Sequence, residues 1–300
     1  RAPDEAPGRT PPSCRGIGND AQGEALARIV SFVEARGAVA GIQLAHAGRK
    51  GSIARPWERS RPLGRADGGW EVIGPSPVPF AEGHPVPAEM HAADIERVMG
   101  AFASAARRAR GAGFRVLEIH AAHGYLIHQF LSPLSNHRQD SYGGDRTGRM
   151  RFLMEVLDAV RSEWPMSQPL LVRVSCTDWM EGGWDLHDTL MLARALEARG
   201  DVDAIDCSSG GSDPRQQIPT HPGYQVPFAA AVRRETGIPT IAVGLIHKAD
   251  MAEQILGNTQ ADVVALGRSL LDDPYWPLHA ARHLRARVAW PVQYERGDIF

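Results

Sequence analysis

The sequence predicts a parallel α/β fold, and two observations carry this prediction. Short apolar runs alternate with segments in which apolar side chains recur at helical spacing. No shift in composition marks a domain boundary along the 300 residues. Because right-handed crossovers return each strand to a parallel neighbour, single strands separated by helices build one sheet. The expected architecture is a TIM (β/α)8 barrel, with residues 1–300 in a single domain.

The expected elements follow one another in a regular order. Apolar residues at helical spacing, such as Leu26 and Val33, mark the first helix at 19–36. Residues 51–89 are rich in Pro, Gly and Arg, which predicts a long loop or lid. The other helices are expected at 92–111, 149–164, 186–199, 226–235 and 249–256. The strands are expected at 38–44, 114–119, 170–174, 204–207, 240–243 and 263–266.

The strand count distinguishes two kinds of parallel sheet. A closed barrel has eight βα units, whereas the sequence supplies about six, which correspond to strands 3 to 8 of a barrel. An open doubly wound sheet would tolerate six strands. However, no Gly-x-Gly-x-x-Gly follows the first strand, which weakens the nucleotide-binding form of that alternative.

Composition and charge narrow the class of protein. The chain is 43% hydrophobic and 23% charged with a formal net charge of -2, which is typical of a globular protein. Its basic residues are scattered, so no nucleic-acid partner is expected. The apolar runs are too short to cross a bilayer and no signal segment opens the chain, so we expect a cytoplasmic protein. Cys14, Cys176 and Cys207 show no paired spacing, which argues against a disulfide framework.

Polar side chains gather where the predicted strands end. The 114–119 strand leads directly into His120, His123 and Tyr125. In a parallel barrel all the strand ends meet at one face, where such folds hold their chemistry. Glycine turns after the last two strands suit a phosphate held by backbone N–H groups. The complete set is Gln43, His120, His123, Tyr125, Arg173, Ser208, Ser209, Gly244, Gly267 and Arg268.

The residues alone leave a second chemistry open. His120 and His123 are also metal-ligand types, and Glu118 would share a face with His120 because the two lie two positions apart on a strand. A metal-dependent barrel hydrolase is therefore an alternative. It leaves Tyr125 and Arg173 without a role, so we expect no metal in this site.

Several longer motifs resemble one known family. The runs GIQLAHAGRK at 41–50, HAAHGYL at 120–126, LSPLSNHR at 131–138, YGG at 142–144 and PVQYERG at 291–297 resemble the Old Yellow Enzyme family of flavin-dependent ene reductases. Within it, they are similar to the bacterial thermophilic-like or xenobiotic-reductase-like branch. The match runs collinearly from about residue 8 to residue 297.

The resemblance implies FMN as cofactor and NADPH as reductant. Gln43 matches the family residue at the pyrimidine edge of the flavin, and Arg173 matches the one beside N1. A cation there would stabilise the negative charge of the reduced ring. Gly244, Gly267 and Arg268 match the turn that holds the phosphate of FMN.

The resemblance also implies a small-molecule substrate with an activated C=C bond. His120 and His123 match the donors to the carbonyl or nitro oxygen of the alkene, and Tyr125 matches the donor of a proton to its α-carbon. Arg296 matches an arginine that reaches into a neighbouring subunit's site, which implies a homo-oligomer, either a dimer or a tetramer.

The family begins about two βα units before the first strand found here. We therefore expect an N-terminally incomplete barrel that folds poorly or binds FMN weakly, since an open barrel exposes two strand edges. Two alternatives within the resemblance are a dienoyl-CoA-reductase-like flavoenzyme and an inactive truncated homologue.

Overall fold

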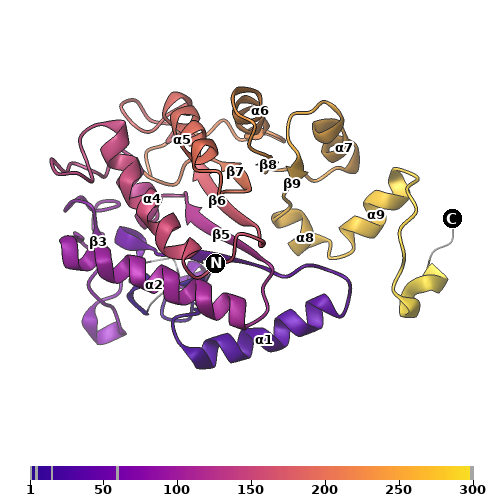
Figure 1. Ribbon diagram of the computed structural model, residues 1–300, viewed down its shortest axis with the longest axis horizontal. Coiled ribbons are helices and arrows are strands. Elements are labelled where there is room, and N and C mark those ends of the chain that lie inside the picture. Colours follow the sequence, from indigo (N-terminus) through magenta and orange to yellow (C-terminus); the bar gives the residue numbers. More distant parts are fainter. Residues whose placement is uncertain (1, 4–5, 15, 59–60, 298–300) are drawn as a thin grey trace.

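A parallel sheet whose strands pair in chain order forms the centre of the protein (Figure 1). The computed structural model describes residues 2–3, 6–14, 16–58 and 61–297. The predicted parallel α/β class is confirmed, and the six expected strands are all present, joined by the two-residue strand β1 at one edge. In sheet order the strands are β1 (Ala2–Pro3), β2 (Gly41–Ala45), β5 (Val116–Ala121), β6 (Leu170–Ser175), β7 (Ala204–Ser208), β8 (Thr240–Ala242) and β9 (Val263–Val264).

Helices alternate with these strands, and each of the six predicted helices is present. Three short helices, α3, α8 and α9, were not predicted. The α-helices of the described residues are α1 (Asp20–Glu34), α2 (Ala92–Gly111), α3 (Leu126–Leu131), α4 (Arg146–Arg161), α5 (Leu186–Arg199), α6 (Val226–Glu235), α7 (Ala249–Gly257), α8 (Arg268–Asp272) and α9 (Trp276–His283).

Helix α4 begins three residues before its predicted start at residue 149. The reason is local, because the side chain of Asp145 caps the helix by accepting a hydrogen bond of 2.8 Å from the backbone N–H of Gly148. Acceptance of an otherwise unpaired first-turn N–H is typically worth about 1 kcal/mol. The cap therefore fixes where the chain leaves the turn that follows the HAAHGYL motif.

The 51–89 segment is a long excursion that contains short regular elements. Two of its strands pair in parallel with each other, apart from the main sheet. Its elements are the 3-10 helices η3 (Pro56–Glu58) and η4 (Arg65–Asp67) and the strands β3 (Ile73–Gly74) and β4 (Ala88–Glu89). The remaining 3-10 helices are η1 (Ala6–Gly8), η2 (Gly48–Lys50) and η5 (Val292–Gly297).

The core lies between the sheet and the helices α2 and α4. Leu117 and Ile119 of β5 are fully buried, as are Phe102 of α2 and Phe152 and Val156 of α4. Burial of one such side chain contributes about 1.5–3 kcal/mol. The middle strands are therefore the best-packed part of the sheet, and this packing fixes the positions of the polar groups at their ends.

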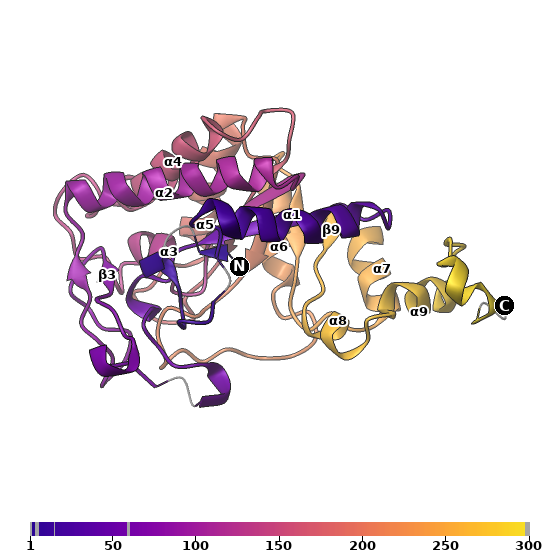
Figure 2. The same cartoon turned by 90° about the horizontal axis from the view of Figure 1, so that it is seen from below.

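The far end of the chain is less enclosed. Strand β9 is an edge of the sheet, and Val263 in it is 49% exposed. Helix α9 and the following η5 extend away from the sheet (Figure 2). Among the described residues, no helix is both long and apolar enough to cross a membrane.

Candidate functional site

A cavity of about 810 Å³ opens at the carboxyl ends of the last strands. This volume falls in the range of small-molecule and cofactor pockets. Residues from β6, from the ends of β7 and β8 and from α8 and α9 line it together. The lining includes His123, Arg173, Ser208, Gly244, Gly267, Arg268 and Trp276. Six of the predicted site residues are thus brought to one cavity by strand ends far apart in the sequence.

His120, His123 and Tyr125 lie together at the end of β5. The ring centroids of His120 and His123 are 5.0 Å apart, and those of His120 and Tyr125 are 5.2 Å apart. His123 Nδ1 is 3.3 Å from His120 Nε2. The prediction that the strand delivers these three groups to one place is confirmed by the geometry, and their chemical roles remain proposals.

The turn that carries this group has an unusual backbone. His123 has a φ of 59° and Gly124 a φ of 70°, so two successive residues adopt the left-handed region. Tyr125 follows directly as the N-cap of α3. A turn of this kind persists only where surrounding contacts fix it, and those contacts are described below.

Ser208 and Gln225 extend the group beyond the predicted residues. His123 Nε2 is 2.7 Å from Ser208 Oγ, which also donates to Gln225 Oε1 at 3.4 Å. Gln225 lies at the N-cap of α6 and accepts a second, shorter hydrogen bond of 2.6 Å from Ser209. Ser208 was visible in the sequence as a polar residue at a strand end, whereas Gln225 carried no such signal.

A charged cluster lies inside the sheet beneath the cavity. The register pairs His120 with Arg173 and Arg173 with Asp206, so these side chains share one face. Arg173 Nε is 3.3 Å from Asp206 Oδ2. On the neighbouring strand, Gln43 Nε2 donates to Glu118 Oε1 at 2.5 Å. Gln43 therefore bonds a buried carboxyl in this structure and is not among the residues that line the cavity.

Burial changes the ionisation of the two carboxyl groups in this cluster. It raises the pKa of Asp206 to about 7, an effect that Arg173 opposes and the adjacent Glu118 reinforces. Burial also raises the pKa of Glu118, against the pull of Arg173 and of the hydrogen bond from Gln43. We infer that one proton is shared by the pair near neutral pH, which leaves one carboxylate to balance Arg173.

Replacement of Asp206 by Asn is expected to flatten the dependence of stability on pH. The folded chain holds a proton that the unfolded chain has already released, so the free energy of unfolding falls as pH rises from about 4 to about 7. The slope per proton is at most about 1.4 kcal/mol per pH unit. Thermal unfolding at pH 5, 6, 7 and 8 measures it. Equal slopes for wild type and Asp206→Asn would contradict the assignment.

The opposite wall of the cavity carries the glycine turns. Gly244 follows β8 with a φ of 128°, and a Cβ there would lie 3.0 Å from Gln225 Nε2. Gly267 is the N-cap of α8 and Arg268 its first residue. The turns leave room for a bulky anion, with a cation beside it. The residues present are therefore compatible with an anionic cofactor such as FMN.

Two other predictions concern residues outside this cavity. Arg296 lies exposed in η5, at the end of the chain that extends away from the sheet (Figure 2). For the metal alternative, no group of three or more His, Cys, Asp or Glu side chains in the described part of the chain could hold an ion. Glu118 does not complete such a set, because it bonds Gln43.

Comparison with known sequences places the chain among flavin enzymes. Residues 3–287 match the model of the NADH:flavin oxidoreductase / NADH oxidase family. The chain is 49% identical to an NADPH dehydrogenase of Geobacillus thermodenitrificans over 285 residues, which are 95% of this chain and 78% of the relative. It is 44% identical to an NADPH dehydrogenase of Bacillus subtilis over 282 residues, 94% of this chain and 78% of that one.

Solved structures of similar fold agree with this placement. A complex of 2-naphthoyl-CoA reductase with 2-naphthoyl-CoA is 26% identical with a TM-score of 0.82, and covers 94% of this chain and 44% of its own. Morphinone reductase is 26% identical with a TM-score of 0.77, and the match covers 97% of this chain and 77% of that chain. The resemblance seen in the sequence motifs is thereby confirmed. The chain belongs to the NADH:flavin oxidoreductase / NADH oxidase family, that of the Old Yellow Enzymes, whose members are enzymes that use FMN with NADPH as reductant.

Proposed function

We propose that this enzyme is an ene reductase, which uses NADPH to reduce the activated C=C bond of α,β-unsaturated carbonyl or nitro compounds. The observation that carries the proposal is the placement of two histidines and a tyrosine beside a cavity that offers Arg173 and Arg268. One wall of the site thus supplies hydrogen-bond and proton donors, and the other supplies cations for an anionic cofactor.

The residues on the cofactor side hold and orient FMN. Arg268, with the turns at Gly244 and Gly267, binds the phosphate. Arg173, whose charge is balanced by Asp206, would lie beside the pyrimidine part of the ring. Gln43 would bind the edge of the same ring, which requires its amide to turn from Glu118. When bound, FMN supplies the hydride that the alkene accepts.

The two histidines bind the oxygen of the substrate. A neutral imidazole has one N–H to donate, so in the contact between His123 and His120 one ring donates to the other. Substrate oxygen replaces this contact and receives one N–H from each ring. This requires His123 to carry its proton on Nδ1 and to accept at Nε2 from the hydroxyl of Ser208, which turns from Gln225. The hydrogen bonds withdraw electron density from the double bond and make its β-carbon a better hydride acceptor. Ser208 keeps the ring of His123 in place throughout.

Tyr125 delivers the proton to the α-carbon. A phenolic hydroxyl is a hydrogen-bond donor and can act as a general acid. Lys50 stands beside it, with Nζ 5.5 Å from the centre of the Tyr125 ring and 4.4 Å from that of Phe80. A cation so placed stabilises the tyrosinate left after proton transfer.

Three wider proposals concern the 51–89 segment, the fold and the assembly. Phe80 belongs to the 51–89 excursion, so this segment borders the substrate side and acts as a lid.

The sequential parallel strands, with polar residues at their carboxyl ends, support an eight-stranded barrel of which this sheet is a part. The exposed Arg296 is available to a second copy of the chain, as a homo-oligomer requires.

Separate half-reactions test the proposed function. The chain is loaded with FMN, reduced anaerobically with NADPH and then mixed with a cyclic enone or a nitroalkene. We expect the flavin absorbance to disappear in the first step and to return in the second, with formation of the saturated product. Reoxidation by oxygen alone, with the alkene recovered unchanged, would overturn the proposal.

Arg268→Ala is expected to weaken FMN binding without changing the binding of riboflavin. Arg268 lies at the phosphate turn, and riboflavin is FMN without its phosphate. Loss of one charge-assisted contact is worth about 1.5–3 kcal/mol, or roughly a 10- to 100-fold rise in Kd. Flavin fluorescence titrations measure both ligands. Arg234→Ala, on the exposed face of α6, serves as a matched control that changes neither Kd. Equal losses for both flavins would contradict the phosphate assignment.

A further inference from the structure

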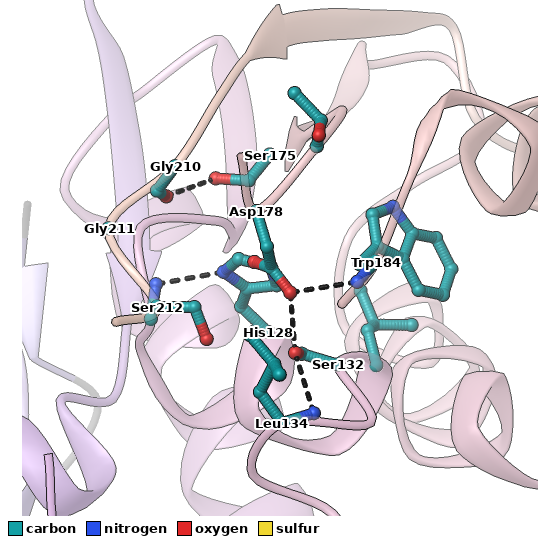
Figure 3. Close-up of polar contacts among 12 residues, drawn as sticks. His128, Ser132, Leu134, Ser175, Asp178, Trp184, Gly210, Gly211 and Ser212 are labelled. Carbon is teal, nitrogen blue, oxygen red and sulfur yellow. Dashed lines mark hydrogen bonds and ion pairs between the residues drawn. The ribbon is translucent and has the colours of Figure 1, made fainter. Parts of the chain in front are cut away.

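A buried polar network (Figure 3) contacts the turn of the HAAHGYL motif through His128, which accepts a hydrogen bond from the backbone N–H of Gly124. His128, Ser132 and Asp178 are each fully buried. Ser132 Oγ donates to Asp178 Oδ2 at 2.6 Å, and the backbone N–H of Trp184 donates to the same oxygen at 2.9 Å. His128 Nε2 lies 3.1 Å from the other oxygen, Asp178 Oδ1, in an off-axis contact. The chemistry proposed above uses none of these residues.

These three residue types also make up hydrolytic triads, but their arrangement here is different. Ser132 donates to Asp178 rather than to the histidine, so no base is placed to take its proton. All three side chains have no exposed surface, which leaves a substrate no route to the hydroxyl. The network therefore acts on the protein itself rather than on a ligand.

The proton of the His128 ring has a position that the contacts dictate. The backbone N–H of Gly124 donates to His128 Nδ1 at 2.8 Å. A backbone N–H can only donate, so Nδ1 carries a lone pair and the ring is neutral with its proton on Nε2. That proton faces the carboxylate of Asp178, which stabilises an N–H there and would repel a lone pair.

Asp178 is suited to this role because it stays ionised. It accepts hydrogen bonds from the hydroxyl of Ser132 and from the backbone N–H of Trp184, and both bonds favour the ionised carboxylate. An ionised carboxylate accepts hydrogen bonds and donates none. His128 therefore presents a permanent acceptor to the turn on its other side.

The peptide groups of the His123-Gly124 turn each make a hydrogen bond with a surrounding side chain. Gln129 Nε2 donates to the carbonyl of Gly124 at 2.8 Å, and Lys50 Nζ donates to the carbonyl of His123 at 3.0 Å. Ser175 Oγ accepts from the N–H of His123 at 2.9 Å. The bond to His128 is the one on the Gly124 N–H, in the middle of the left-handed pair and directly before Tyr125.

We propose that His128 and Asp178 are positioning residues: Asp178 fixes the Nε2–H tautomer of His128, and the resulting Nδ1 lone pair holds the Gly124 N–H and thereby the placement of Tyr125. This inference rests on the proposed role of Tyr125 as proton donor. Loss of the acceptor lets the His123-Gly124 turn relax, and Tyr125 then moves relative to the α-carbon it protonates. A displacement of about 1 Å can cost about 100-fold in rate.

A matched pair of variants separates the roles of the two nitrogens of the His128 ring. The amide oxygen of Asn in His128→Asn reaches the place of Nδ1 and can accept from Gly124, whereas the amide nitrogen of Gln in His128→Gln reaches the place of Nε2 and can donate to Asp178. In FMN-loaded protein, we expect His128→Gln to slow alkene reduction about 10- to 100-fold. His128→Asn should stay within about threefold of wild type, and reduction of flavin by NADPH should change less than twofold in either.

A spectroscopic measurement reads the tautomer without reference to activity. Two-bond 1H–15N spectra of protein labelled at histidine nitrogen should show the His128 proton on Nε2 in wild type. Asp178→Asn keeps an acceptor for Ser132 and Trp184 but turns an amide N–H toward Nε2, so the ring proton should move to Nδ1. This variant also removes a charge near the buried Arg49. The kinetic comparison is therefore made with His128→Gln and His128→Asn.

The outcomes distinguish this inference from the proposed function. A wild-type ring with its proton on Nδ1 would overturn the inference, as would equal slowing of both half-reactions by His128→Gln or a larger loss in His128→Asn. If His128→Gln does not fold, the spectra of wild type and Asp178→Asn decide. Tyr125→Phe measured in parallel tests the proposed function, since an unchanged alkene step there would refute the role of Tyr125 while leaving the tautomer result standing.

Discussion

Tyr125→Phe is expected to slow alkene reduction about 100- to 10,000-fold while leaving flavin reduction by NADPH within a factor of two. A positioned general acid contributes about this much to a rate. The substitution removes only the hydroxyl, and the ring that packs 5.2 Å from His120 remains. Stopped-flow absorbance of the flavin, recorded separately for reduction by NADPH and oxidation by a cyclic enone, measures the two steps.

A second tyrosine supplies the matched control. The hydroxyl of Tyr142 donates to Glu155 at 2.7 Å, on the outer side of α4. Tyr142→Phe removes a hydroxyl of the same type and should leave both half-reactions unchanged. A substrate whose product anion needs no immediate protonation should also be insensitive to Tyr125→Phe. Equal slowing of both half-reactions in Tyr125→Phe would point to a disturbed cofactor site and contradict the proton-donor role.

The repeating part of the fold could be predicted because burial enforces a pattern. Strands buried on both faces, such as β5 and β6, read as short apolar runs, and the long helices between them show apolar residues at helical spacing. Helix α3 escaped this test, because each of its six residues is buried and no polar face remains to reveal a period. Strand β1 is two residues long and is defined by its pairing with β2 rather than by its side chains.

The candidate site, like the fold, could be predicted only in part. His120, His123 and Tyr125 were found because they cluster within six positions after a strand. Glu118 and Asp206 are charged residues in otherwise apolar strands, a signal that identifies each one but not its partner. The partner is set by the register of neighbouring strands, which only the assembled sheet defines.

The network of His128, Ser132 and Asp178 could not be predicted from the sequence at all. His128 carries no sequence signal that points to Asp178, which lies 50 positions further on in a loop after β6. Nothing local joins the two residues. Their contact follows from packing α3 against the loop that connects β6 to α5, and such long-range contacts become visible only once the fold is known.

Gly124→Ala is expected to destabilise the protein by about 2–5 kcal/mol and to abolish the geometry of the site. A left-handed backbone costs a residue with a Cβ about 1–2 kcal/mol, and Gly124 has a φ of 70°. The new methyl group would also overlap the carbonyl oxygen of Gly211 and lie 2.9 Å from Ser212 Cα, both backbone atoms. Overpacking of a rigid site adds about 1–3 kcal/mol.

Gly144→Ala isolates the first of these effects, the left-handed strain. Gly144 has a φ of 69°, nearly the same as Gly124, but a Cβ there would meet nothing within 4 Å. It should therefore cost only the left-handed strain of about 1–2 kcal/mol and leave both half-reactions intact. Urea unfolding of the two variants and of wild type measures the difference. Because the backbone conformations are matched, any excess loss in Gly124→Ala reports the contact between the catalytic turn and the 211–212 loop, and equal losses would mean that this contact yields without cost and cannot hold Tyr125 in place.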